Sequence, residues 1–314
     1  MADARVVCIG LATLDVIVVV DRLPRTDDWL PASDASFAGG GPAPTAAVAL
    51  ARLGVPVAFV GSVGTDDAGR RVRDELAAEG VDVSACRLVD GTTPFSVILV
   101  EQATGARSIV PWAGSARLSA LDDASVTMCR EAEWVHVDHV AITHVRDLRA
   151  RAVTARISLD AGNPIADPAL DAIDLYAPTE AALLARYPTA SLADALRAAV
   201  DEGPAIAVAT RGANGSCAAI RSDDGAVRIV EAPGFPVEVV STLGAGDVFH
   251  GALLSAIAGG DSIDAALPFA NAAAALSCRA LDGRSAIPRR DELERFLASA
   301  GTAASVSEGG RRGG

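Results

Sequence analysis

Residues 237–251 read VEVVSTLGAGDVFHG, and this stretch decides the fold. Its β-branched start, residues 237–240, predicts a strand, and the apolar run from about residue 247 to 257 predicts a helix. The turn between them, Gly244-Ala245-Gly246, can direct consecutive backbone N–H groups into one concavity at the positive end of the helix dipole. The sequence therefore predicts an anion-binding turn between a strand and a helix.

Asp247 adds a second chemical group to this turn. A site that only holds phosphate gains nothing from a carboxylate, whereas deprotonating a hydroxyl beside a phosphoryl group requires a general base. Asp247 and the amides of Gly244, Ala245 and Gly246 are therefore typical of phosphoryl transfer to an alcohol. Two interpretations stay open: an Asp that only favours the helix dipole, and a loose dinucleotide fingerprint completed by Gly251. The second is weak, because residues 262–280 predict another helix instead of the next strand.

A second glycine-rich stretch, residues 39–54, reads GGGPAPTAAVALARLG. It resembles the N-terminal signature of the ribokinase-like (PfkB-type) carbohydrate kinases, and residues 242–247 resemble their C-terminal signature, in which the Asp is the catalytic base. The resemblance covers about residues 5–299. Within the family, residues 10–17 (GLATLDVI) and 242–247 are similar to ketohexokinase, and residues 39–54 and 244–251 to bacterial sulfofructose kinase. The resemblance implies a sugar kinase that uses ATP and Mg²⁺.

The composition is compatible with such an enzyme. Half of the 314 residues are hydrophobic, which suffices for a large core, and the net charge of −13 argues against nucleic acid or an anionic membrane as partners. No apolar run approaches the length of a membrane span, and the N-terminus lacks the features of a signal peptide. The dispersed cysteines predict buried thiols in a cytoplasmic protein; they are Cys8, Cys86, Cys129, Cys217 and Cys278.

Alternating strand and helix patterns predict an α/β fold, with a doubly wound, mostly parallel sheet flanked by helices. The expected strands are residues 6–9, 57–60, 134–137, 157–159 and 205–209, and the expected helices include residues 43–53 and 66–79. Antiparallel ribbons are expected for residues 16–20 with 29–37 and for residues 95–100 with 108–112. The resemblance implies that these ribbons form a small β lid, at about residues 12–38 and 93–113, and a homodimer interface. We expect one kinase domain over residues 1–300 and a disordered tail over residues 301–314.

The resemblance also assigns the acceptor side of the site. Asp15 matches the sugar-anchoring aspartate of the family, and a carboxylate can accept hydrogen bonds from two hydroxyls. Gly40 and Gly41 would let the backbone approach the sugar closely. Pro42 and Thr45 stand where relatives carry Asn, so we expect the pattern of hydroxyls that is read to differ.

Further substrate-side matches are Arg107 and Asp138, although Arg107 can equally be a surface charge. His139 stands where sulfofructose kinase carries its sulfonate-binding arginine, which argues against an organosulfonate substrate. Two alternatives to a sugar kinase remain open. A nucleoside kinase of the same fold would need an aromatic slot for a base, and a non-catalytic sugar or nucleotide sensor would not need Asp247.

The nucleotide side rests on the resemblance as well. Residues 210–215 (TRGANG) match a loop that approaches the ATP phosphates, or form a hairpin turn. The matched nucleotide-binding positions are Thr210, Gly212, Gly215, Asn271 and Gly283. Glu180 matches a residue that organises Mg²⁺ through water, while its partner Asn is replaced by Ala177. Ser241 replaces an Asp that is often a monovalent-cation ligand in the family, so we expect weak or no activation by K⁺.

Overall fold

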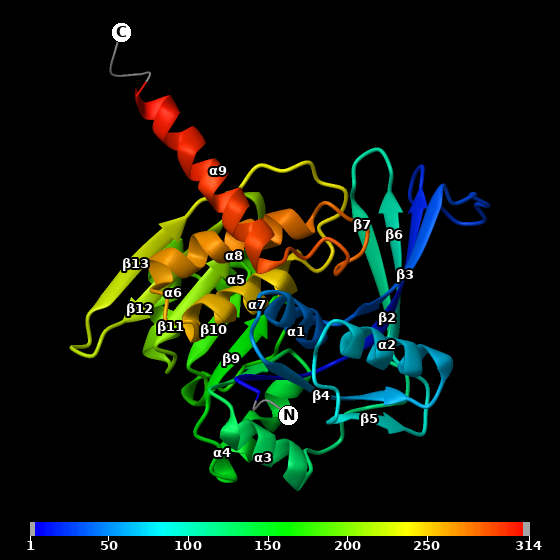
Figure 1. Ribbon diagram of the computed structural model, residues 1–314, viewed down its shortest axis with the longest axis horizontal. Helices are drawn as coiled ribbons and strands as arrows, with labels where there is room; N and C mark the ends of the chain where they lie inside the picture. The colour runs from blue at the N-terminus through cyan, green and yellow to red at the C-terminus, as the bar shows by residue number, and fades with distance from the viewer. Residues whose placement is uncertain (1–3, 310–314) are drawn as a thin grey trace.

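The computed structural model describes residues 4–309 and contains a large β-sheet with helices on both faces (Figure 1). The strands of this sheet are β1 (Val6–Ile9), β4 (Val57–Gly64), β5 (Cys86–Val89), β8 (Trp134–Val137), β9 (Arg156–Ala161), β10 (Leu175–Pro178), β11 (Ile206–Thr210), β12 (Ser216–Arg221) and β13 (Val227–Ala232). Their order is β13-β12-β11-β10-β9-β8-β1-β4-β5. Neighbours from β11 to β5 are parallel, and β12 and β13 are antiparallel.

The sheet separates two hydrophobic cores, because successive strand residues point to opposite faces. In β1, Val6 and Cys8 face one core, and Val7 and Ile9 face the other. The first core is closed by α1 (Pro42–Arg52), α2 (Asp67–Ala78), α7 (Ala245–Ala258), α8 (Ile263–Ser277) and α9 (Arg290–Gly309). The second is closed by α3 (Asp123–Glu131), α4 (Val145–Ala150), α5 (Glu180–Arg186) and α6 (Leu192–Asp201). The predicted doubly wound, mostly parallel fold is confirmed.

A second, smaller sheet stands beside the main body (Figure 1). It contains β2 (Thr13–Val20), β3 (Asp34–Gly40), β6 (Phe95–Glu101) and β7 (Arg107–Trp112), in the order β3-β2-β6-β7. The pairs β2–β3 and β6–β7 are the two expected antiparallel ribbons, and β2 pairs with β6 in parallel. This sheet is the predicted lid.

Two expectations differ from the structure. Residues 237–240 do not form a strand but an extended segment between β13 and α7, in which Val239 and Val240 are about half exposed. Val240 N donates to the carbonyl of Cys278 rather than to a strand. β-branched residues favour strands only where a neighbouring strand and a packed face exist. Residues 301–309 of the expected tail belong to helix α9, and residues 310–314 lie outside the described residues.

Helices α1 and α7 approach each other through small residues. A Cβ on Gly251 would lie 2.5 Å from Ala46 O and 2.8 Å from Ala49 Cβ, so only glycine permits this distance. Both helices begin at a glycine with positive φ, Gly41 and Gly244, and both of these glycines border the same cavity. The packing of α1 on α7 therefore fixes two helix N-termini at one site.

The remaining global expectations concern cysteines and membranes. All five cysteines are buried and free, as predicted. Among residues 4–309, the helices are too short or too polar to span a membrane.

Candidate active site

A cavity of about 1270 Å³ lies where the carboxyl ends of the parallel strands meet the lid. Ligands of open α/β sheets bind at this edge. Most of the predicted site residues border it: Asp15, Gly41, Arg107, Glu180, Thr210, Gly212, Gly215, Gly244, Ala245, Gly246, Asp247 and Asn271. The remaining predicted residues are not among those that border it: Gly40, Thr45, Asp138 and Gly283.

The predicted anion-binding turn begins helix α7. Gly244 has φ of 73°, a left-handed conformation that favours glycine, and no side chain caps the helix. The amide of Ala245 makes only a long contact of 3.4 Å to Thr242 O. A Cβ on Gly246 would meet open space, and within residues 4–309 the amide of Gly246 has no acceptor. These donors and the helix dipole are available to an anion.

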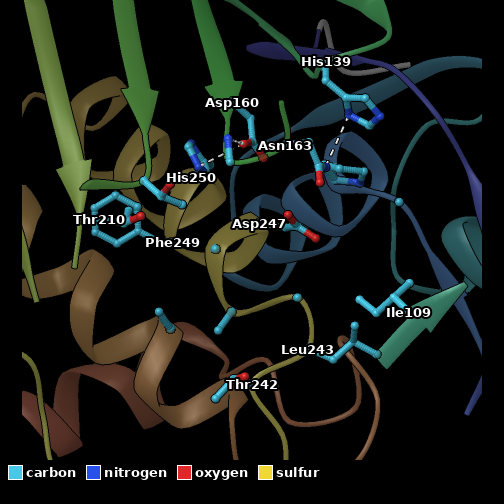
Figure 2. A pocket seen from close by; sticks show the side chains of 18 of the residues that line it. Ile109, His139, Asp160, Asn163, Thr210, Thr242, Leu243, Asp247, Phe249 and His250 are labelled. Carbon is cyan, nitrogen blue, oxygen red and sulfur yellow. Dashed lines mark hydrogen bonds and ion pairs between the residues drawn. The ribbon is translucent and has the colours of Figure 1, made fainter. Parts of the chain in front are cut away.

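Asp247 lies in the first turn of α7 and borders the cavity between Asp160 and Leu243 (Figure 2). Burial raises the pKa of Asp247 well above its ordinary value, and the carboxylates of Asp160, Asp15 and Asp138 raise it further. The guanidinium of Arg284 acts in the opposite direction. Because a carboxylate with a raised pKa is a better proton acceptor once ionised, this environment suits a general base.

A buried polar cluster beside Asp247 escaped the sequence analysis. Oδ1 of Asp160, near the end of β9, lies 3.3 Å from Nε2 of His250. Both side chains are labelled in Figure 2. The ring of His136 lies 5.8 Å from that of His250, and burial lowers the pKa of His136 to about 3. Two features of the sequence could have indicated this cluster. Asp160 directly follows a predicted strand, and His250 follows Asp247 by three residues, which places His250 and Asp247 on one face of a helix.

Asp15, the residue expected to bind the acceptor, borders the cavity. It is 9% exposed, Thr13 Oγ1 donates to its Oδ1 at 3.0 Å, and burial raises the pKa of its carboxyl. A Cβ on Gly40 would lie 2.2 Å from Asp15 Oδ2. Residue 40 therefore has to be glycine, because any Cβ there would overlap the carboxylate of Asp15. Of Gly40 and Gly41, only Gly41 borders the cavity.

Thr45 and Asp138 have partners inside the protein. The hydroxyl of Thr45 accepts a hydrogen bond from Arg284 Nε at 3.2 Å, and Thr45 does not border the cavity. Asp138 is fully buried and accepts from the backbone N–H groups of Leu11, Val140 and Ala141 at 2.8–3.0 Å. These contacts fix the backbone after β1, which forms part of the cavity wall.

Arg107 crosses from the lid to the anion-binding turn. Its Nη1 donates to Oγ1 of Thr242, two residues before Gly244. The side chain therefore borders the cavity next to the predicted anion-binding turn.

The expected nucleotide side lies at the ends of β10 and β11. Thr210 ends β11, and residues 210–215 form both a cavity wall and the hairpin into the antiparallel strand β12. Asn271 Nδ2 donates to the carbonyls of Ala232 and Pro233, so this side chain holds the segment after β13. Gly283 packs on the anion-binding turn, since a Cβ on Gly244 would lie 2.9 Å from its Cα.

The carboxylate of Glu180 borders the cavity and lies 3.7 Å from Nε of Arg211, beyond hydrogen-bond distance. In the described part of the chain, no group of three or more His, Cys, Asp or Glu could hold a metal ion.

Gly40→Ala is expected to lower kcat/KM for the acceptor by roughly 10- to 100-fold, because its Cβ would displace the carboxylate of Asp15. Steady-state kinetics of single and double variants would measure this. In an Asp15→Ala background the same substitution should cost little, since its effect acts through that carboxylate. Equal losses in both backgrounds would contradict the contact.

Curated proteins similar to this chain include ribokinases, a ketohexokinase and a fructokinase, and also an aminoimidazole riboside kinase. The ribokinase of Bacillus subtilis is 30% identical over 306 residues, covering 93% of this chain and 99% of the ribokinase. An ATP-dependent ribose-1-phosphate kinase of Halopiger xanaduensis is 30% identical over 303 residues, covering 93% and 98%. Mouse ketohexokinase, whose motifs we expected to be the nearest, is less similar, at 26% over 301 residues and 88% and 97% coverage.

Solved structures agree with the fold. Arabidopsis thaliana ribokinase complexed with ribose and ATP is 25% identical with a TM-score of 0.81, covering 95% of this chain and 99% of the ribokinase. A ribokinase II from E. coli, in complex with ATP and Mg²⁺, has a TM-score of 0.78 at 22% identity, covering 94% and 99%. The sequence profile of the pfkB family carbohydrate kinases matches residues 3–290, and the chain therefore belongs to this family of phosphotransferases.

Proposed function

We propose that the protein is an ATP-dependent sugar kinase that phosphorylates a primary hydroxyl of a small carbohydrate. The observation that carries this proposal is the position of Asp247. Its carboxylate stands at the N-terminus of α7, in one cavity with Asp15 and with the nucleotide-side loop at Thr210. A base, an anion-binding turn and an acceptor-binding carboxylate are the parts that phosphoryl transfer to an alcohol requires.

The proposed reaction places the acceptor between Asp15 and Asp247. Asp15 accepts hydrogen bonds from sugar hydroxyls, while Asp247 accepts the proton of the hydroxyl that attacks the γ-phosphorus of ATP. The oxygen–phosphorus bond to the new ester forms as the bond to the ADP oxygen breaks, and the amides of residues 244–246 stabilise the charge on the transferring group. Arg107, from the lid, can add positive charge at this end.

ATP would lie along the wall formed by Thr210, Gly212, Gly215 and Asn271. Bound Mg²⁺ supplies charge neutralisation of the phosphate oxygens, and Glu180 would hold it through water. We also propose a cytoplasmic location and a homodimer through the lid, whose exposed apolar side chains include Phe37 and Val110, at 52% and 61% exposure. Light scattering at several concentrations tests the dimer.

Ribose is the first acceptor to test, because the Arabidopsis relative binds ribose with ATP. A coupled assay of ADP release across ribose, ribose 1-phosphate, fructose, other ketoses and nucleosides tests the function. We expect turnover with at least one carbohydrate and its absence in Asp247→Asn. Strong nucleotide or sugar binding without ADP release would favour the alternative of a non-catalytic sensor.

A nucleoside kinase is the second candidate. The rings of Phe95 and Trp112 lie 5.1 Å apart, and both border the cavity on the lid side together with Ile109. This wall is apolar enough to hold a planar base next to a ribose bound at Asp15. Higher kcat/KM for a nucleoside than for any free sugar would select this candidate.

We expect weak or no activation by K⁺ relative to Na⁺. Ser241 is buried, and its Oγ accepts from Leu243 N at 3.2 Å, so this position offers a hydroxyl and no charge. Hard cations favour oxygen-rich, charged sites. Initial rates in matched K⁺ and Na⁺ buffers test this, and Ser241→Asp should increase the difference. Several-fold activation of the unmodified protein by millimolar K⁺ would disprove it.

A further inference from the structure

Arg284 is 7% exposed and contacts the turn formed by residues 39–41, here called the acceptor turn. Its Nη2 donates to the carbonyl of Gly40 at 2.8 Å, and its Nε donates to Thr45 Oγ1 at 3.2 Å. A Cβ on Gly39 would lie 2.3 Å from Nη1 of the same side chain. The guanidinium therefore holds the turn formed by residues 39–41, which begins α1 and contacts Asp15.

The loop that carries Arg284 also contacts the anion-binding turn, residues 244–246, which precedes Asp247. Gly283, the preceding residue, packs on Gly244, where a Cβ would lie 3.0 Å from its carbonyl oxygen. Asp282 Oδ1 accepts from the backbone N–H groups of Arg284 and Ser285 at 2.8 and 2.7 Å, which fixes the loop. One short segment thus joins the acceptor turn to the turn that carries the general base.

The charges around this guanidinium are mostly negative. It faces the carboxylates of Asp15 on β2, Glu75 on α2 and Asp247 on α7, together with Asp282 on its own loop. Arg52 on α1 donates to carbonyls of the same loop and pairs with Glu79 at 2.6 Å.

Asp247 faces further acids on other elements. These are Asp160 on β9 and Asp138 after β8, while His250 pairs with Asp160. Arg284 is the cation that counteracts these acids at Asp247. A buried guanidinium carries a large desolvation cost, and its Nη1 has no hydrogen-bond partner among the described residues. Because burying this charge lowers the stability of the fold, the position of Arg284 calls for a functional explanation.

We propose that Arg284 is a positioning residue for phosphoryl transfer, whose planar fork holds the acceptor turn against the anion-binding turn and whose fixed charge favours the ionised forms of Asp15 and Asp247. This inference rests on the proposed function, because it concerns the same base. Arginine suits the role because it stays protonated when buried and donates in two directions at once.

Two variants separate charge from geometry. Arg284→Gln removes the charge and should lower kcat/KM at neutral pH, with the acidic limb of the pH profile moved up by about one unit, because the base loses its neighbouring cation. Arg284→Lys retains the charge without the fork, so its acidic limb should stay near that of the unmodified protein while KM for the acceptor rises.

Arg52→Gln is the matched control. Arg52 Nη1 donates to the carbonyls of Arg284 and Ile287, so its loss loosens the same loop without removing a charge that faces Asp247. We expect a lower Tm with an unmoved acidic limb. An acidic limb that moves equally in Arg52→Gln and Arg284→Gln would overturn the role of the charge.

A measurement without turnover separates this inference from the proposed function. Carboxyl ¹³C NMR of Asp-labelled protein, with Asp247→Asn for assignment, follows the titration of Asp247 directly. A higher midpoint in folded Arg284→Gln than in Arg284→Lys and the unmodified protein supports the inference, and equal midpoints overturn it. Failure of every acceptor in the coupled assay would instead reject the kinase proposal and leave this result standing.

Discussion

Asp247→Asn is expected to lower kcat by a factor on the order of 10²–10⁴ while ATP binding is retained. Asn has the shape of Asp but cannot take the proton of the acceptor hydroxyl, and the amides of residues 244–246 remain in place. Single-turnover kinetics and calorimetric titration with an ATP analogue measure the two effects separately. Turnover close to that of the unmodified protein would show that Asp247 is not the base.

The stability of this variant provides the control. The pKa of Asp247 is raised on folding, so above that raised pKa the ionised carboxylate disfavours the folded state. Asp247→Asn should therefore unfold at a higher Tm near neutral pH, and this difference should vanish as the pH falls below the pKa of an unfolded Asp. An inactive variant with a raised Tm has lost chemistry and not structure.

Asp15→Ala should cost about 2–4 kcal/mol in kcat/KM for the acceptor, because substrate hydroxyls at a buried site are left without a partner. Asp15 is 9% exposed and lines the cavity, whereas Asp34 on the adjacent strand β3 is exposed and lies outside it. Asp34→Ala is therefore a matched control that should leave kcat/KM nearly unchanged. Equal small effects of both substitutions would remove Asp15 from the acceptor site.

The fold was predictable where its causes are local or periodic. Residues 6–9 and 134–137 form strands with the predicted bounds, because short apolar runs suit strands that are buried on both faces. Residues 237–240 have the same β-branched character but no strand beside them, and propensity alone does not create a strand. The glycine turn at Gly244 was predictable because its backbone conformation depends on residue type.

The site was predictable only in part, because several of its contacts join distant residues. Arg284 donates a hydrogen bond to Thr45, 239 positions away in the sequence, and the residues around neither one indicate this contact. Asp138 shows the same limit, since the family resemblance predicted proximity to substrate, while its oxygens accept hydrogen bonds from the backbone amides of Leu11 and Ala141. The contact between Asp160 and His250 could not be predicted, because the sequence does not show which strand end faces α7.

The close contact of α1 with α7 through Gly251 has a consequence for how this enzyme can diversify. Added atoms at this contact would shift the turn formed by residues 39–41 relative to Asp247, so we expect selection to remove almost every substitution there. The lid residues Phe95, Ile109 and Trp112 border the same cavity from separate strands and carry none of the proposed chemistry. Mutational scanning should therefore find intolerance at Gly251 and freedom in the lid, where new acceptor preferences can arise without loss of turnover.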